Sequence, residues 1–192
     1  MIAKYLQENP QVRVLVDATS RRVDLIEEGL DVAIRVRVPP LEDTELAVRP
    51  LSVSARILVA SPALFQRDHV PDTIEALTEW PTLSMSSNGE KVVWNLLDAE
   101  GKTSTLTHQP RMATDDLASL RVAALQGLGV ALLPRELIDA DIKAGWLTHL
   151  LPHLSTTPGL IHAVFPSRRG MVPAVRKLLD ALVEGFEKMH GQ

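Results

Sequence analysis

The chain contains no cysteine among its 192 residues. This absence excludes disulfide bonds, thiolate nucleophiles and zinc sites built on cysteine, and it is compatible with a reducing compartment. No apolar run approaches the roughly 20 residues that a membrane-spanning helix needs. The first ten residues hold no apolar stretch long enough for a signal peptide. We therefore expect a soluble, cytoplasmic protein with no membrane partner.

Clustered positive charge is also absent. The chain has 20 basic and 24 acidic residues, for a formal net charge of −4, and its tightest basic groups are the pairs Arg21-Arg22 and Arg168-Arg169. A nucleic-acid surface needs grouped lysine and arginine side chains to neutralise phosphates. The composition therefore predicts that this chain does not itself form a DNA-binding surface.

Catalytic and metal-binding motifs are missing as well. The sequence has no P-loop, no GxSxG elbow and no HExxH, and Gly127-Leu128-Gly129 lacks the third glycine of a dinucleotide-binding turn. His149 and His153 are four residues apart, but Pro152 between them breaks the helix that would make them a metal-binding pair. The acidic neighbours Glu27-Glu28 would point apart on a helix. We expect no enzymatic activity, no cofactor and no metal.

The chain does have a large apolar content, 45%, enough for the core of one domain or of two small lobes. Strand-like and helix-like patterns alternate, which predicts an α/β fold with mostly parallel sheets. Two candidate linkers cover residues 50–55 and 155–159. The predicted strands are 12–16, 32–38, 46–51, 56–60, 82–85, 92–97, 104–107, 111–113, 130–133, 146–151 and 160–165. The predicted helices are 2–8, a short one from Pro62, 73–79, 115–126, 134–143 and 172–189.

The segment Arg21 to Arg35 has the clearest local pattern. Val23, Ile26 and Leu30 recur at helical spacing and would form the apolar side of an amphipathic helix. Gly29 suits the end of that helix, where a left-handed backbone is needed. A buried strand over residues 32–38 then follows.

Three polar segments could bind a small molecule, because ligands of open α/β sheets bind where strands end. Thr19 and Ser20 join a predicted strand to a helix start, and they could bind an anion or serve only as an N-cap. The segment Ser84 to Gly89 is rich in hydroxyls, but it could equally be a solvated loop. Thr114-Asp115-Asp116 precedes an apolar helical pattern, so it is a capping signal as well as a candidate site. Arg35 could meet a carboxylate, although we expect it on the surface.

Seven pieces of the chain, taken in order, resemble one family. They are Tyr5-Leu6 with Asn9-Pro10, Arg21 to Arg35, Arg56 to Leu64, Trp94-Asn95-Leu96, Thr114 to Leu117, Ala123 to Pro134 and His162 to Val175. The series is similar to the C-terminal effector-binding domain of LysR-type transcriptional regulators, without their N-terminal winged helix-turn-helix. The resemblance implies an α/β fold of two Rossmann-like lobes, like that of type-II periplasmic binding proteins. Lobe one would comprise residues 1–54 plus 159–192, and lobe two residues 55–158.

The resemblance also implies what the domain does. A small effector would bind in the cleft between the lobes, and hydroxyls and helix N-termini there favour an anionic metabolite. The candidate effector-binding residues are Thr19, Ser20, Ser86, Ser87, Asn88, Thr114, Asp115 and Phe165. The domain would form a homodimer or tetramer through residues 23–29 and 116–126, and it would reach DNA only through an N-terminal domain absent from this chain. The alternative is a stand-alone small-molecule (solute) binding protein on the same fold.

In that family's fold the first strand of lobe one lies between residues 12–16 and 32–38, and it is missing from these residues. Its absence would leave a slot about 10 Å wide, two strand spacings, lined by unpaired backbone groups. Each buried unpaired group costs about 1–3 kcal/mol. We therefore expect lobe one to be less stable than lobe two, or the two flanking strands to close up, or a partner chain to fill the slot.

Overall fold

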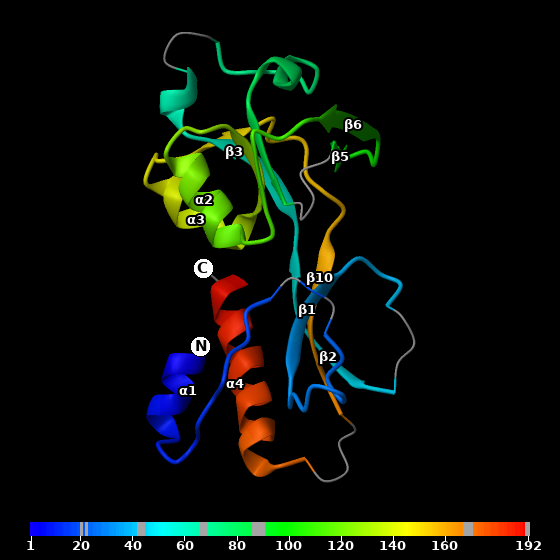
Figure 1. Ribbon diagram of the computed structural model, residues 1–192, viewed down its shortest axis with the longest axis vertical. Helices are drawn as coiled ribbons and strands as arrows, with labels where there is room; N and C mark the ends of the chain where they lie inside the picture. Colours follow the sequence, from blue (N-terminus) through cyan, green and yellow to red (C-terminus); the bar gives the residue numbers. More distant parts are fainter. Residues whose placement is uncertain are drawn as a thin grey trace. The chain divides into compact units, whose positions relative to one another are not determined.

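The computed structural model describes residues 1–19, 21, 23–41, 45–65, 69–85, 91–166 and 171–190. The chain divides into two compact units (Figure 1). Unit 1 comprises residues 1–53 and 159–192, and unit 2 comprises residues 54–158. The first crossing, between Val53 and Ser54, lies within the predicted linker at 50–55. Most of that linker is strand, because β2 continues to Ser54 and β3 begins at Arg56. Among the described residues, no helix is long and apolar enough to cross a membrane.

The described strands of unit 1 form a three-stranded sheet. Their order is β1 (Ala33–Arg37), β10 (Gly159–Phe165) and β2 (Ala47–Ser54), and β1 is antiparallel to β10. Helix α4 (Pro173–His190) buries Leu179 against Ala163 and Phe165 of β10. The helix predicted over residues 172–189 is therefore confirmed, and Leu179 lies on its core-facing side.

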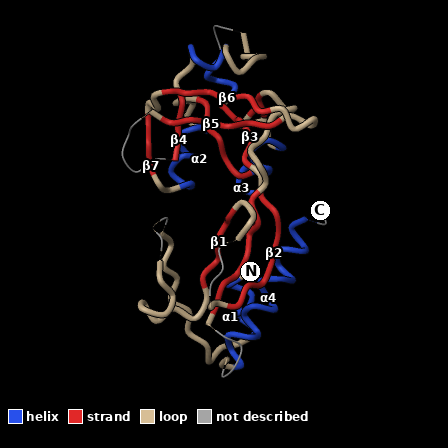
Figure 2. The backbone as a smooth tube through the Cα atoms, turned by 90° about the vertical axis from the view of Figure 1, so that its right-hand side faces the viewer, coloured by secondary structure: helices blue, strands red, loops and turns tan. Residues whose placement is uncertain are grey.

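Helix α1 (Ile2–Glu8) forms where the sequence predicts it and lies beside α4 (Figure 2). Tyr5 is buried, and its hydroxyl donates to the Ala174 carbonyl oxygen at 2.8 Å. Gly185 permits this close approach, since a Cβ there would lie 2.2 Å from a side-chain atom of Met1. The contact between the two helices thus depends on the Tyr5 hydrogen bond and on the absence of a side chain at Gly185.

The predicted buried strand over residues 12–16 is wrong. These residues form no strand, and the side chains of Leu15 and Val16 are 95% and 62% exposed. An apolar run becomes a strand only where a neighbour pairs with its backbone, and no described strand does so here. The predicted flanking strands have therefore not closed up onto each other.

Strand β1 is confirmed, but its predicted burial is wrong. It is an edge strand whose described neighbour is β10 (Figure 1). Ile34 and Val36 point to the same face of the sheet, and they are 47% and 50% exposed because no described element covers that face at β1. One row of β1 amides and carbonyls is therefore open to pairing.

The segment Arg21 to Arg35 contains a helical turn in place of the predicted amphipathic helix. Asp24 begins the turn by accepting a hydrogen bond from the Ile26 amide at 2.9 Å. Gly29, with φ of 65°, ends it as predicted. Leu25 is the buried side chain, whereas Ile26 is 65% exposed. A turn this short cannot align Val23, Ile26 and Leu30 on one face, so the predicted stripe does not form.

The described residues of unit 2 form a five-stranded sheet in the order β7-β4-β8-β3-β9. The strands are β3 (Arg56–Ala60), β4 (Thr82–Met85), β7 (Met112–Thr114), β8 (Val130–Pro134) and β9 (Thr148–Leu150). Strand β4 is parallel to β7 and β8, whereas β3 is antiparallel to β8 and β9. The expectation of mostly parallel sheets is therefore wrong. Strand β3 runs antiparallel because the chain enters unit 2 at the end of the sheet where β4 and β8 finish.

The two faces of this sheet are covered by different elements (Figure 1). Helices α2 (Leu117–Leu125) and α3 (Arg135–Lys143) lie on one face, and the hairpin β5 (Val92–Leu97) with β6 (Thr103–His108) lies on the other. Ile57 of β3 packs toward the helices, and Leu58 packs toward the hairpin. Two 3₁₀ helices, Pro62–Phe65 and Ala76–Glu79, complete the unit.

The two helices are joined by an ion pair. The Arg121 guanidinium donates from Nε and from one terminal nitrogen to the two carboxylate oxygens of Asp141, each at 2.6 Å. Asp141 is buried. A buried carboxylate needs such a two-pronged partner, so this pair fixes how α2 lies against α3.

Gly127 and Gly129 are required for two separate backbone reasons. Gly127, with φ of 71°, ends α2. A Cβ on Gly129 would lie 2.5 Å from the Pro81 carbonyl oxygen, so only glycine lets this turn approach the start of β4. The Gly-Leu-Gly sequence thus serves helix termination and packing.

Hydrogen exchange should differ between the two units. We expect the amides of residues 12–16 and of the open edge of β1 to exchange far faster than those of β8, which lies between β4 and β3. Exchange measured by mass spectrometry on the intact chain tests this, with β10, the central strand of unit 1, as the internal control. Equal protection of residues 12–16 and β8 would contradict the described pairing.

Candidate functional site

The ends of β4 and β7 bring two of the predicted segments together. Met85, the last described residue of the hydroxyl-rich segment, pairs with Thr114 in parallel register. Ser86, Ser87 and Asn88 lie outside the described residues, as does Ser20 of the other predicted segment. Open α/β sheets bind ligands at the carboxyl ends of their parallel strands. The candidate site is therefore this edge of unit 2, meaning the end of the sheet where β4, β7 and β8 finish.

Asp116 occupies the start of α2, which follows β7 at this edge. Its carboxylate accepts hydrogen bonds from the amides of Ala118 and Ser119, at 3.2 and 2.8 Å, and from the Ser119 hydroxyl at 2.5 Å. The Ser119 hydroxyl and these amides lower the pKa of Asp116. The predicted capping signal is therefore confirmed, with Asp116 as the cap. An anionic ligand cannot use these two amides while the carboxylate holds them.

Thr114 has a hydroxyl that can still donate. Its Oγ1 accepts a hydrogen bond from the Asp116 amide at 3.2 Å, and the residue is half-buried. A hydroxyl that accepts one bond keeps its own hydrogen for another acceptor. Its neighbour Asp115 is exposed. Thr114 is therefore placed to bind an oxygen atom of a small molecule at this edge.

Arg56 lies at the same edge and is not among the candidate residues predicted from the sequence. It pairs with Pro134, the last residue of β8. The Arg56 amide donates to Thr156 Oγ1 at 3.0 Å, and the Thr156 amide donates to the Arg56 carbonyl oxygen at 3.0 Å. Burial lowers the pKa of Arg56. Its sequence signal was a cation at the first position of an otherwise apolar strand.

A buried polar row ties the hairpin to β4 behind this edge. Thr82 Oγ1 and His108 Nδ1 are 2.6 Å apart, and Trp94 Nε1 donates to Ser84 Oγ at 3.3 Å. The rings of Trp94 and His108 are in contact, with centroids 4.1 Å apart. Burial lowers the pKa of His108, which favours the neutral imidazole. Ser84 therefore serves the packing of the hairpin.

The candidate residues of unit 1 have local partners. Thr19 is exposed, and its Oγ1 accepts a hydrogen bond from the Arg21 amide at 3.3 Å, as in a turn. Phe165 is 2% exposed and lies in the core beneath α4. Arg35, expected on the surface, is partly buried and donates to the Val23 carbonyl oxygen at 2.7 Å. Their roles in binding stay predictions.

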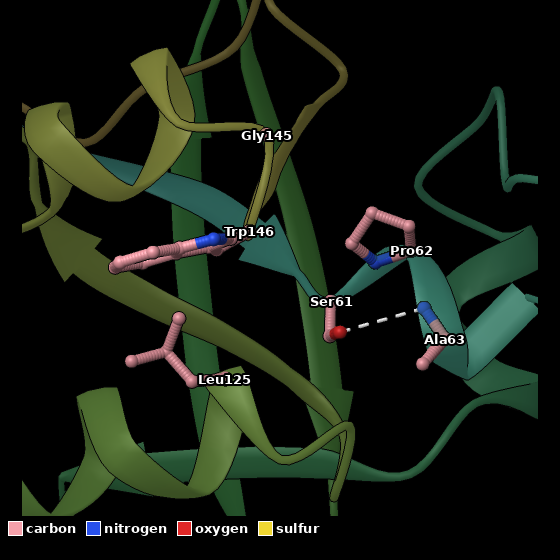
Figure 3. A pocket seen from close by; sticks show the side chains of 6 residues that line it. All are labelled: Ser61, Pro62, Ala63, Leu125, Gly145 and Trp146. Atoms are coloured by element: carbon pink, nitrogen blue, oxygen red, sulfur yellow. Dashed lines mark hydrogen bonds between the residues drawn. The ribbon is translucent and has the colours of Figure 1, made fainter.

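A shallow recess of about 480 Å³ lies at the opposite end of the unit 2 sheet (Figure 3). It is lined by Ser61, Pro62, Ala63, Leu125, Gly145 and Trp146. Ser61 follows the end of β3, which is where β4 and β8 begin. The recess is mainly apolar, and its one side-chain hydroxyl, on Ser61, accepts from the Ala63 amide at 3.4 Å. It therefore contains none of the predicted site residues.

The described residues contain no group of three or more His, Cys, Asp or Glu side chains able to hold a metal ion.

Residues 1–187 match the LysR substrate binding domain. The HTH-type transcriptional regulator CrgA of Neisseria meningitidis is 29% identical over 96% of this chain and 60% of its own length. The HTH-type transcriptional activator AaeR of Escherichia coli is 27% identical over 100% of this chain and 63% of its own length.

Solved structures agree with the family match. The match to the solved structure of the CrgA regulatory domain from Neisseria meningitidis covers 96% of this chain and 89% of that domain. Its TM-score is 0.82 and the sequence identity is 29%. The type-II periplasmic-binding-protein-like fold that the resemblance implies is therefore confirmed. The chain spans about three fifths of the length of the curated relatives it matches. It belongs to the LysR substrate-binding domain family.

Proposed function

We propose that this chain is the effector-binding and oligomerisation domain of a LysR-type DNA-binding transcriptional regulator. The observation that carries the proposal is the family match over residues 1–187. The sheet edge formed by Thr114, the end of β4 and the start of α2 supports it, because it presents a donor hydroxyl where this class of fold binds ligands. The two units are the two effector-binding lobes.

The relatives support a regulatory role for this chain over a role in transport or catalysis. CrgA and AaeR are both transcriptional regulators. A stand-alone solute-binding protein on the same fold is the less favoured candidate, since no named relative has that role. Thr19, Asp115 and Phe165 remain candidate effector-binding residues on the resemblance alone.

Replacing Thr114 tests the site. We expect Thr114→Val to weaken binding of a small-molecule effector about 2- to 10-fold, the value of one hydrogen bond, whereas Thr114→Ser keeps the hydroxyl and the affinity. A thermal-shift screen of small metabolites identifies the ligand, and calorimetry measures the affinities. Unchanged binding by the valine variant would remove Thr114 from the site. A ligand that binds in the apolar recess beside Trp146 would show that the effector site is not at Thr114.

Self-association should be measurable in this chain. The regions that the family resemblance implicates, residues 23–29 and 116–126, expose the apolar side chains Ile26 (65%) and Val122 (54%). A two-fold pairing would cover both kinds of surface in each copy. We expect a dimer or tetramer by light scattering, and Val122→Asp to shift it toward monomer. A purely monomeric wild-type chain at tens of micromolar would contradict the proposal.

DNA binding should lie outside these residues. The net charge of −4 and the absence of a basic cluster in the sequence oppose phosphate binding. We expect no sequence-specific mobility shift of a promoter fragment with this chain alone. Sub-micromolar, salt-resistant binding would contradict the assignment.

A further inference from the structure

Arg56 is a cation without a counter-charge among the described residues. Its side chain is partly buried, and no described residue accepts a hydrogen bond from its guanidinium or forms an ion pair with it. The other partly buried arginines of the described residues differ. Arg121 and Arg49 are paired with Asp141 and Asp180, and Arg35 donates to a carbonyl oxygen. An unpaired cation removed from water is destabilising, so its retention calls for an explanation other than stability.

The position of Arg56 is fixed on two sides. Its amide and carbonyl oxygen both bond to Thr156, and it pairs with Pro134 across the strand. Side chains alternate along a strand, so Arg56 shares the face of Leu58, the hairpin side of the sheet. The guanidinium is therefore carried by a backbone that is held from both neighbouring segments.

The same edge carries the candidate effector site. Strand β3 is two positions from β4 and three from β7, which corresponds to about 10 and 14 Å. A small organic molecule together with a long arginine side chain spans that distance to Thr114. Thr114 shares the helix side of the sheet with Met112, whereas Arg56 is on the hairpin side. A ligand that contacts both residues must therefore lie across the ends of the strands.

The chemistry of this edge favours a singly charged acid. Two amides at the start of α2 are held by Asp116, so they are not free for an anion. Arg135, another cation at this edge, begins α3 and has a counter-charge, since its Nε lies 3.9 Å from a carboxylate oxygen of Asp139. One guanidinium and one hydroxyl, with Asp115 and Asp116 nearby, match a carboxylate better than a doubly charged phosphate.

We propose that the Arg56 guanidinium binds a carboxylate of the effector and makes this domain selective for small organic acids over their neutral analogues. This inference rests on the proposed effector-binding function, which it deepens by naming the ligand class and the residue that selects it. Thr156 acts as the positioning residue, because its hydroxyl and amide hold the Arg56 backbone.

The test compares Arg56→Met with Arg135→Met in the 192-residue chain. The probes are aliphatic and aromatic monocarboxylates, each beside its neutral primary amide, and inorganic phosphate, all at constant ionic strength. Thermal unfolding finds the compounds that bind, and calorimetry measures their affinities. We expect carboxylates to raise the unfolding midpoint of the wild type and their amides not to do so.

Arg56→Met should weaken carboxylate binding at least about tenfold, as expected for a hydrogen bond to a charged group. Arg135→Met should leave it within about twofold. Without ligand, the unfolding midpoint of Arg56→Met should equal or exceed that of the wild type, because a desolvated unpaired charge is removed. A structural role for Arg56 predicts the opposite, a lower midpoint with unchanged ligand affinity.

The outcomes separate this inference from the proposed function. Equal binding of acids and amides, tighter binding of phosphate, or unchanged affinity in Arg56→Met would overturn the role of Arg56. A neutral ligand whose binding Thr114→Val weakens would do so while leaving the effector site in place. If no compound of either series binds the wild type, both proposals are contradicted.

Discussion

The antiparallel pairing of β3 with β8 is the constraint on which the arrangement of unit 2 depends. Because the chain enters the unit on β3, the first residue of that strand must lie where β4 and β8 end. This places Arg56 beside Pro134, at the same edge as Thr114. The far end of β3 then leads to Ser61 and the apolar recess. The direction of one strand thus sets which polar groups share an edge.

Around that strand, each face of the sheet is held differently. The helical face is fixed by the Arg121–Asp141 pair and by Asp116, which caps α2. The hairpin face is fixed by Trp94 and His108, whose polar atoms bond to Ser84 and Thr82. These bonds satisfy the buried polar atoms that they join, as a rigid scaffold requires, but Nε2 of His108 is buried without a hydrogen-bond partner among the described residues. Arg56 has no counter-charge among the described residues, and its proposed role in binding starts from that observation.

Unit 1 shows what happens when the pairing requirement is not met. Residues 12–16 have the composition of a buried strand, yet Leu15 is 95% exposed, because no described neighbour pairs with its backbone. Ile34 and Val36 of β1 are also exposed, although β1 is paired with β10 at the sheet edge. Strand propensity therefore gave a strand at β1, where β10 supplies a ladder, and an irregular segment at 12–16.

The sequence by itself determined the features that depend on local or ordered patterns. The family, the α/β class, the helices at 2–8 and 172–189, the glycine stops at Gly29 and Gly127, and the capping segment before α2 were all readable from it. Of the candidate site, the sequence selected Thr114, and the sheet pairs this residue with Met85. Only the tertiary structure decided which runs became strands, which strand ran antiparallel and whether Arg56 found a counter-charge. Those outcomes depend on partners distant in sequence, and a residue's own pattern carries no record of what will pair with it.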